Sequence, residues 1–119
     1  MINRVVLVGR LATDCVLRYS RDGLAISAFS VTLGRSETGG DFLPVVVFRR
    51  LAEATWRYLR KGRLVGIEGR LASRTLDTSD GEQRRVIEIV ADRLRFLDPP
   101  IALGEDAPNP EPSDQAAQA

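Results

Sequence analysis

The stretch DFLPVVVFRRLAEATWRYLRKG, residues 41–62, changes its hydrophobic period halfway along. In its first half, an extended chain alternates its side chains between two faces, so that Phe42 and Phe48 share one face. The residues on the other face are all aliphatic: Leu43, Val45 and Val47. We therefore expect a strand, residues 41–50, whose aliphatic side fills a core while both rings point away from it.

The second half of the stretch follows a helical period. Apolar or small residues recur at spacings of three and four along it: Leu51, Ala52, Thr55, Trp56 and Leu59. Arg60 and Lys61 would occupy the last turn, and Gly62 would end the helix. One helix is predicted here, with Trp56 packed in the core or at an interface.

The rest of the body alternates with the period of strands. The segments are residues 4–11, 16–20, 24–34, 64–77 and 84–97. The turn signals RDG at 21–23 and TSDG at 78–81 predict hairpins. We predict an all-β fold, a five-stranded Greek-key barrel with its helix between the third and fourth strands, which is the oligonucleotide/oligosaccharide-binding (OB) fold. Periodicity alone leaves this fold as one candidate among small barrels.

Two strands carry more detailed expectations. In residues 64–77 the core side would hold Val65, Ile67, Gly69 and Leu71, and the opposite side would hold Glu68, Arg70, Ala72, Arg74 and Leu76. Gly66 and Gly69 stand where a small barrel bends sharply. In residues 84–97 both parities carry apolar residues, so its faces are not assigned.

The first strand is apolar on both sides. Val5 and Leu7 share one face, and Val6 and Val8 share the other. Both faces should then be buried, one by the domain and one by another subunit.

Charge and proline divide the chain in two. Residues 1–98 hold all 17 basic residues and 12 acidic ones, whereas residues 99–119 hold four acids, no base and five of the six prolines. Such a segment cannot bury enough apolar surface to offset its ordering entropy. We predict one folded domain over 1–98 and a disordered, acidic tail over 99–119.

Composition argues against catalysis. The chain has no histidine and a single cysteine, Cys15, and it lacks Walker and Rossmann motifs, so we expect neither an enzyme nor a metal or cofactor site. Cys15 is interpreted as a small apolar strand residue in a reducing compartment. No signal peptide or membrane span is evident, and we expect a cytoplasmic, nucleoid-associated protein.

Sixteen of the 17 basic residues are arginine. Arginine binds phosphate through a planar fork and stacks on bases, which suits nucleic acid. A GC-rich genome would produce the same bias, and one sequence leaves both explanations open.

The motifs NRVVLVGRL, YLRKG and GIEGRL occur here in the order and spacing of a known family. Over residues 1–98 the chain closely resembles the bacterial single-stranded DNA-binding proteins. The resemblance implies the OB fold, a homotetramer and the coating of single-stranded DNA in replication, recombination and repair.

Residue by residue, the resemblance implies that Phe42 and Phe48 occupy base-stacking positions. A third stacking position, usually aromatic in the family, falls on Leu76. The resemblance places basic residues along the path of the DNA strand at Arg4, Arg50, Lys61 and Arg74. Arg70, on the same polar side as Arg74, is a further candidate.

The chain also departs from the family. Pro44 stands where some members carry arginine, Cys15 stands where proline is usual, and the acidic hydrophobic tip that docks partner proteins is absent. Docking of partners through the tail is therefore not carried over. Two alternatives stay open: an OB-fold protein-interaction module whose aromatic face serves oligomerisation, and an oligosaccharide-binding protein.

Overall fold

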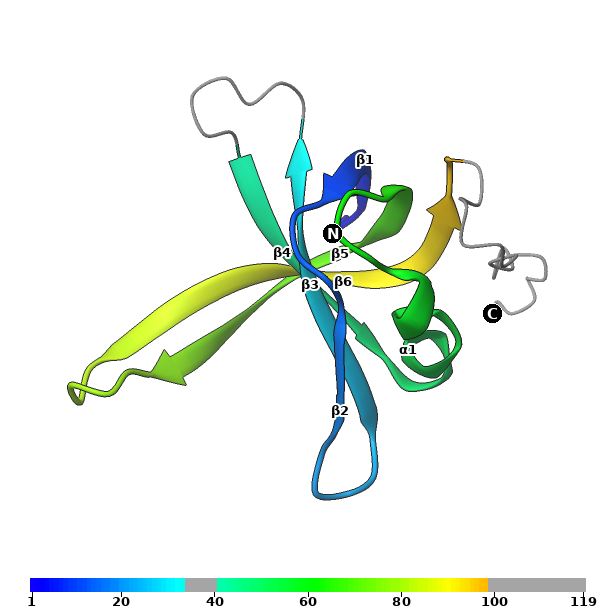
Figure 1. The fold of residues 1–119 in the computed structure, drawn as a ribbon. Coiled ribbons are helices and arrows are strands. Elements are labelled where there is room, and N and C mark those ends of the chain that lie inside the picture. The colour runs from blue at the N-terminus through cyan, green and yellow to red at the C-terminus, as the bar shows by residue number, and fades with distance from the viewer. Residues whose placement is uncertain (34–40, 99–119) are drawn as a thin grey trace.

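The computed structural model describes residues 1–33 and 41–98 (Figure 1). The predicted disordered tail at 99–119 lies outside the described residues. The strands are β1 Val5–Leu11, β2 Val16–Tyr19, β3 Ala25–Leu33, β4 Asp41–Phe48, β5 Leu64–Asp77 and β6 Gln83–Phe96, and the helices are α1 Arg49–Thr55 and a 3-10 turn Trp56–Tyr58.

Five of the six strands close a ring. β1 pairs with β5, β5 with β6, β6 with β4, β4 with β3, and β3 back with β1. All of these pairs are antiparallel except β4 with β6. The ring is the predicted OB-fold barrel, and α1 lies between its third and fourth strands in chain order. Within the described residues the sixth strand, β2, pairs with β3 alone.

Two hairpins extend the barrel. Figure 1 shows β5 and β6 continuing together well away from the barrel as a long arm, and β2 and β3 forming a second projection. Gly23 and Gly81 adopt positive φ in the turns that join these pairs, as the turn signals predict. The arm corrects the prediction for Leu71, which is exposed because β5 has left the barrel core at that point.

The core lies inside the ring. Fully buried aliphatic residues occupy alternate positions of three of its strands: Val31, Val45, Val47, Val65 and Ile67. The predicted core side of residues 41–50 is thus confirmed, with Leu43 half-buried. Gly69 is required by close approach, because an added Cβ would meet the Val90 carbonyl oxygen at 2.0 Å, whereas Gly66 has room for one.

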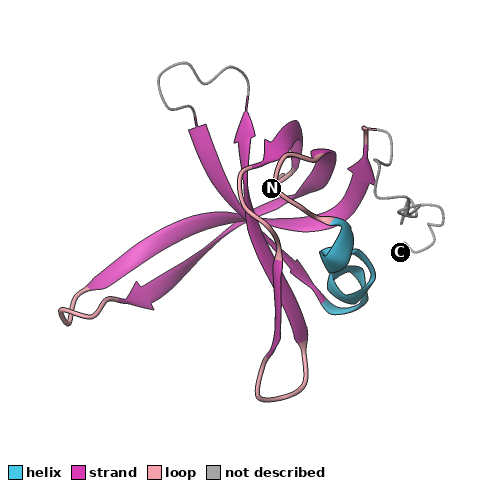
Figure 2. Ribbon diagram, in the orientation of Figure 1, coloured by secondary structure: helices cyan, strands magenta, loops and turns pink. Residues whose placement is uncertain are grey.

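The helical segment differs from the single helix predicted. α1 begins at Arg49, so β4 ends at Phe48 instead of residue 50, and a 3-10 turn follows α1 (Figure 2). The reason is tertiary. Leu59 leaves the helix to enter the core, where its carbonyl accepts a hydrogen bond from the Cys15 amide at 3.0 Å. Trp56 packs against the core, as expected.

A β-bulge explains why alternation in the sequence did not assign the two faces of β6. Glu68 pairs with Arg93 while Gly69 pairs with Ala91, so Asp92 is an extra residue in β6. The inward parity switches there, from Ile89 before the bulge to Leu94 after it.

Candidate nucleic-acid interface

The outer face is defined here as the side of β2–β6 that points away from the barrel core. The register places Phe42 beside Thr32 and Phe48 beside Ile26 on this face. Phe42 is 59% exposed. Phe48 is only half-buried. Both rings therefore point away from the core, but they offer unequal surfaces to a ligand.

One row of paired residues crosses the whole outer face. In strand order it runs through Val16, Ala28, Val46, Val90 and Arg70. Val46 and Val90 are buried although they face outward, and Glu88, two residues before Val90, is buried beside them. We call these three residues the buried strip. The longer side chains around the strip must lean over it, since its own side chains face away from the core.

The predicted site residues divide into two groups. Phe42, Phe48, Arg70, Arg74 and Leu76 share the outer face, with Leu76 further out along the arm. The other three lie elsewhere: Arg50 in the first turn of α1, Lys61 in the turn before β5, and Arg4 ahead of β1. All three are exposed. The register therefore brings together five of the eight residues.

Two of the predicted basic residues form ion pairs with glutamate carboxylates. The Arg74 Nε donates to Glu88 Oε2 at 3.0 Å, and the Arg4 Nη2 donates to Glu68 Oε1 at 3.1 Å. Lys61 has a different link, because its backbone amide donates to Asp14 Oδ1 at 2.8 Å. Arg50 and Arg70 form no ion pair within residues 1–33 and 41–98.

Sequence reasoning missed one arginine of the outer face, Arg18, and the unusual backbone conformation of another, Arg49. Arg18 pairs with Ile26, which pairs in turn with Phe48, so this cation ends the row that contains the ring. The parity of VLRYS gives only the side of the strand on which Arg18 lies, and its place in line with Phe48 depends on the two strand pairings. Arg49 follows Phe48 directly and has φ 61°, the only positive φ at a non-glycine residue in the described part of the chain. Nothing in the sequence around Arg49 indicates this positive φ.

The ionisable side chains with shifted pKa values lie off the outer face. Burial raises the pKa of the Cys15 thiol, which favours its protonated form. Cys15 packs in the core as a small apolar residue, but it lies just ahead of β2 and not in a strand as predicted. Desolvation and then the nearby Glu53 carboxylate raise the pKa of Tyr19. Among the described residues, no three potential metal ligands gather, and no helix is long and apolar enough to cross a membrane.

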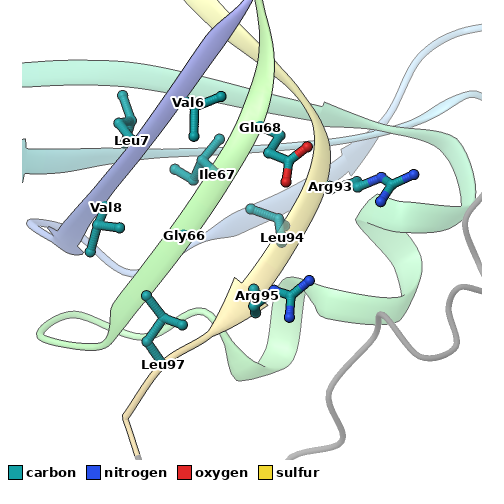
Figure 3. A pocket seen from close by; sticks show the side chains of 10 residues that line it. All are labelled: Val6, Leu7, Val8, Gly66, Ile67, Glu68, Arg93, Leu94, Arg95 and Leu97. Carbon is teal, nitrogen blue, oxygen red and sulfur yellow. The ribbon is translucent and has the colours of Figure 1, made fainter.

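β1 carries a separate apolar surface. Val6 is 70% exposed and Val8 is 53% exposed, while Val5 and Leu7 on the other parity are half-buried. Val6 and Val8 border a cavity of about 180 Å³ that β1 shares with β5 and β6, with Leu97 at one end (Figure 3). One side of the first strand thus packs on the domain and the other remains uncovered in a single chain.

Fold and face together define an OB-fold protein with an open surface of rings and guanidinium groups. A family model described as the single-strand binding protein family matches residues 2–97. The chain therefore belongs to the single-strand binding protein family, as the resemblance indicates.

Similar proteins agree with this assignment. A "Single-stranded DNA-binding protein" of Caldanaerobacter subterraneus subsp. tengcongensis is 41% identical over 93% of this chain and 79% of its own length. "Single-stranded DNA-binding protein 2" of Staphylococcus aureus is 42% identical over 83% and 74%, and the Bacillus cereus protein is 40% identical over 88% and 65%. The solved structure "Plasmodium falciparum SSB complex with ssDNA" matches the fold with a TM-score of 0.70 at 24% identity, covering 82% of this chain and 96% of that one.

Proposed function

We propose that this chain binds single-stranded DNA on its outer face and coats it during replication, recombination or repair. The observation that carries the proposal is the open Phe42 ring on a face that also holds Phe48 and free arginines. Every base has a π face, so stacking on such rings tolerates any sequence. Family membership and the names of the relatives support the same function, and it is binding without catalysis.

Stacking alone is too weak for the task. Each stacked base contributes about 1–3 kcal/mol, so two rings supply about 2–6 kcal/mol before any ordering cost. The remainder would come from phosphate contacts, and each contact makes single-strand affinity fall with salt at a slope of about −0.7. Because leucine replaces an aromatic residue at the third stacking position, DNA binding by this protein should depend heavily on its arginines. Its affinity for single-stranded DNA should therefore be unusually sensitive to salt.

The proposed contact residues are the eight predicted from sequence, joined by Arg18. They are Arg4, Arg18, Phe42, Phe48, Arg50, Lys61, Arg70, Arg74 and Leu76. The outer-face members would stack bases and meet the nearest phosphates. Arg4, Arg50 and Lys61 would meet a strand that continues around the barrel.

Assembly would multiply the affinity of one domain. We propose a homotetramer that covers Val6 and Val8, whose exposure in a single chain supports such an interface. The protein would act in the cytoplasm, on the nucleoid. A molecular mass measured in solution that corresponded to a monomer would overturn the proposed assembly.

The deciding experiment compares affinity for oligo-dT with affinity for duplex DNA at two salt concentrations. We expect a clear preference for the single strand and a steep loss of affinity as salt rises. The half-buried Phe48 ring is the one observation that favours the alternative, a protein-interaction module. Equal affinity for single strand and duplex would favour that alternative.

A further inference from the structure

Glu88 is a buried carboxylate on the face proposed to bind DNA. Its side chain is 8% exposed, and it lies in β6 opposite Ala72 and two residues from Val90. A buried charge is costly unless it is paired, and this one is paired with the Arg74 Nε at 3.0 Å. A carboxylate is unexpected on a surface that must attract phosphates, so its place in the buried strip needs a reason.

The geometry of the pair leaves most of the arginine available. The guanidinium group has five N–H donors in a planar fork, and the described hydrogen bonds commit only Nε, on the side that faces Glu88. The Arg74 side chain is 49% exposed. Its two terminal amino groups therefore remain for a ligand, and they can bind a phosphate in the two-pronged manner of arginine.

The fork stands on the arm, beyond the point where β4 and β6 meet. Arg74 pairs with Val86 across the hairpin, and the pairing of β4 with β6 spans two residue pairs in the described part of the chain, the second of them Val46 with Val90. On the far side of this pairing the β5–β6 arm and the β3–β4 pair run in different directions (Figure 1). Arg74 and Phe42 therefore offer separate contacts on the outer face, the fork to a phosphate and the ring to a base elsewhere along the same DNA strand.

We propose that Glu88 is a positioning residue that orients Arg74 to bind a phosphate of single-stranded DNA. This inference rests on the proposed function. The carboxylate holds Nε, which removes most of the rotational freedom that a long side chain would lose on binding. The neutral pair contributes geometry to the site, while Arg18 and Arg70, which form no ion pair with the described residues, contribute net charge.

The direction in which one substitution changes DNA affinity distinguishes a positioning role of Glu88 from simple repulsion of phosphates. Glu88→Gln keeps the size of the side chain and removes its charge. If Glu88 only repels phosphates, removing the charge should tighten binding and leave the salt slope unchanged or steeper. If Glu88 positions Arg74, affinity should fall about tenfold, as expected when one charge-assisted contact is lost, and the salt slope should become shallower by about 0.7.

A double-mutant cycle with Arg74→Ala completes the test. Glu88→Gln should weaken oligo-dT binding in the wild-type background, and it should leave binding unchanged or tighter when Arg74 is absent. Glu82→Gln, which removes an exposed acid from the turn at the tip of the same arm, is the matched control and should not weaken binding. Thermal denaturation and solution mass of each variant report folding and assembly.

Each outcome has a definite consequence. Folded Glu88→Gln protein that binds as tightly as wild type or tighter, or that loses the same affinity without Arg74, overturns the inference. If Glu88→Gln fails to fold, Arg74→Lys replaces it, since lysine keeps the charge but cannot be held through Nε. That variant should lose affinity, and binding equal to wild type would overturn the inference. Wild-type protein without preference for oligo-dT would instead refute the proposed function.

Discussion

Replacing Phe42 with alanine should weaken DNA binding without affecting the fold. The ring is 59% exposed, and the main contact it would lose is a stacked base. Loss of one stacking contact costs about 1–3 kcal/mol, which lowers affinity by about 5- to 150-fold. Substitution at an exposed position changes the free energy of unfolding by only about 0.5 kcal/mol or less.

Phe48→Ala should have a different signature. Truncating a fully buried phenylalanine costs about 3–5 kcal/mol of stability, so a half-buried ring should cost about half of that. DNA affinity should fall as well, because the exposed half of the ring remains available to a base. The two variants therefore share a binding defect, and only Phe48→Ala unfolds at a lower temperature.

The assay should isolate one domain. Fluorescence anisotropy with a labelled oligo-dT of about eight nucleotides stays within the length that one OB fold covers. Ile87→Ala is the matched control, because Ile87 is 60% exposed on the opposite side of the β5–β6 hairpin. An unchanged affinity in folded Phe42→Ala protein, or an equal loss in Ile87→Ala, would refute the reasoning.

Four further substitutions test the scaffold by chemical denaturation. Arg49→Gly should raise stability by about 1 kcal/mol, because glycine adopts φ 61° without strain; lower stability would mean that the arginine side chain outweighs that strain. Gly69→Ala should cost about 3 kcal/mol or more and Gly66→Ala should be nearly neutral, since only the first places a Cβ against a backbone oxygen; equal effects would contradict this. Asp98→Ala should cost about 2–3 kcal/mol, because it leaves the mostly buried Arg63 without the carboxylate that accepts from its Nε at 3.1 Å; an unchanged stability would show that water replaces the pair.

Alternation in the sequence predicted which side each residue of β4 faces, but not how deep it lies. Val46 shares the outer side with Phe42, yet it is buried and Phe42 is open. Depth depends on how β4 meets β6, a parallel pairing between segments over 40 residues apart. Local periodicity carries no information about such a contact. For the same reason Leu71, an inward-facing residue by parity, lies exposed on the arm.

The candidate site was predictable in part for a related reason. The resemblance identified residues at positions that match the family's binding residues, and the alternation of the sequence predicted the face of the strand on which each of them lies. Neither could reveal that Glu88 holds Arg74, because the two residues are 14 positions apart and meet only through the hairpin register. Neither could place Arg18 in line with Phe48, since that neighbourhood spans two strand pairings.

The two rings should act independently of each other. Phe42 and Phe48 are six positions apart on extended β4, which at about 3.3 Å per position is about 20 Å. Contributions from sites more than about 10 Å apart usually add. One base cannot touch both rings, so the binding losses of Phe42→Ala and Phe48→Ala should sum in the double variant. If the double variant bound DNA as tightly as the weaker-binding single variant, the two rings would serve one shared contact. That result would contradict the independence expected from their spacing along β4.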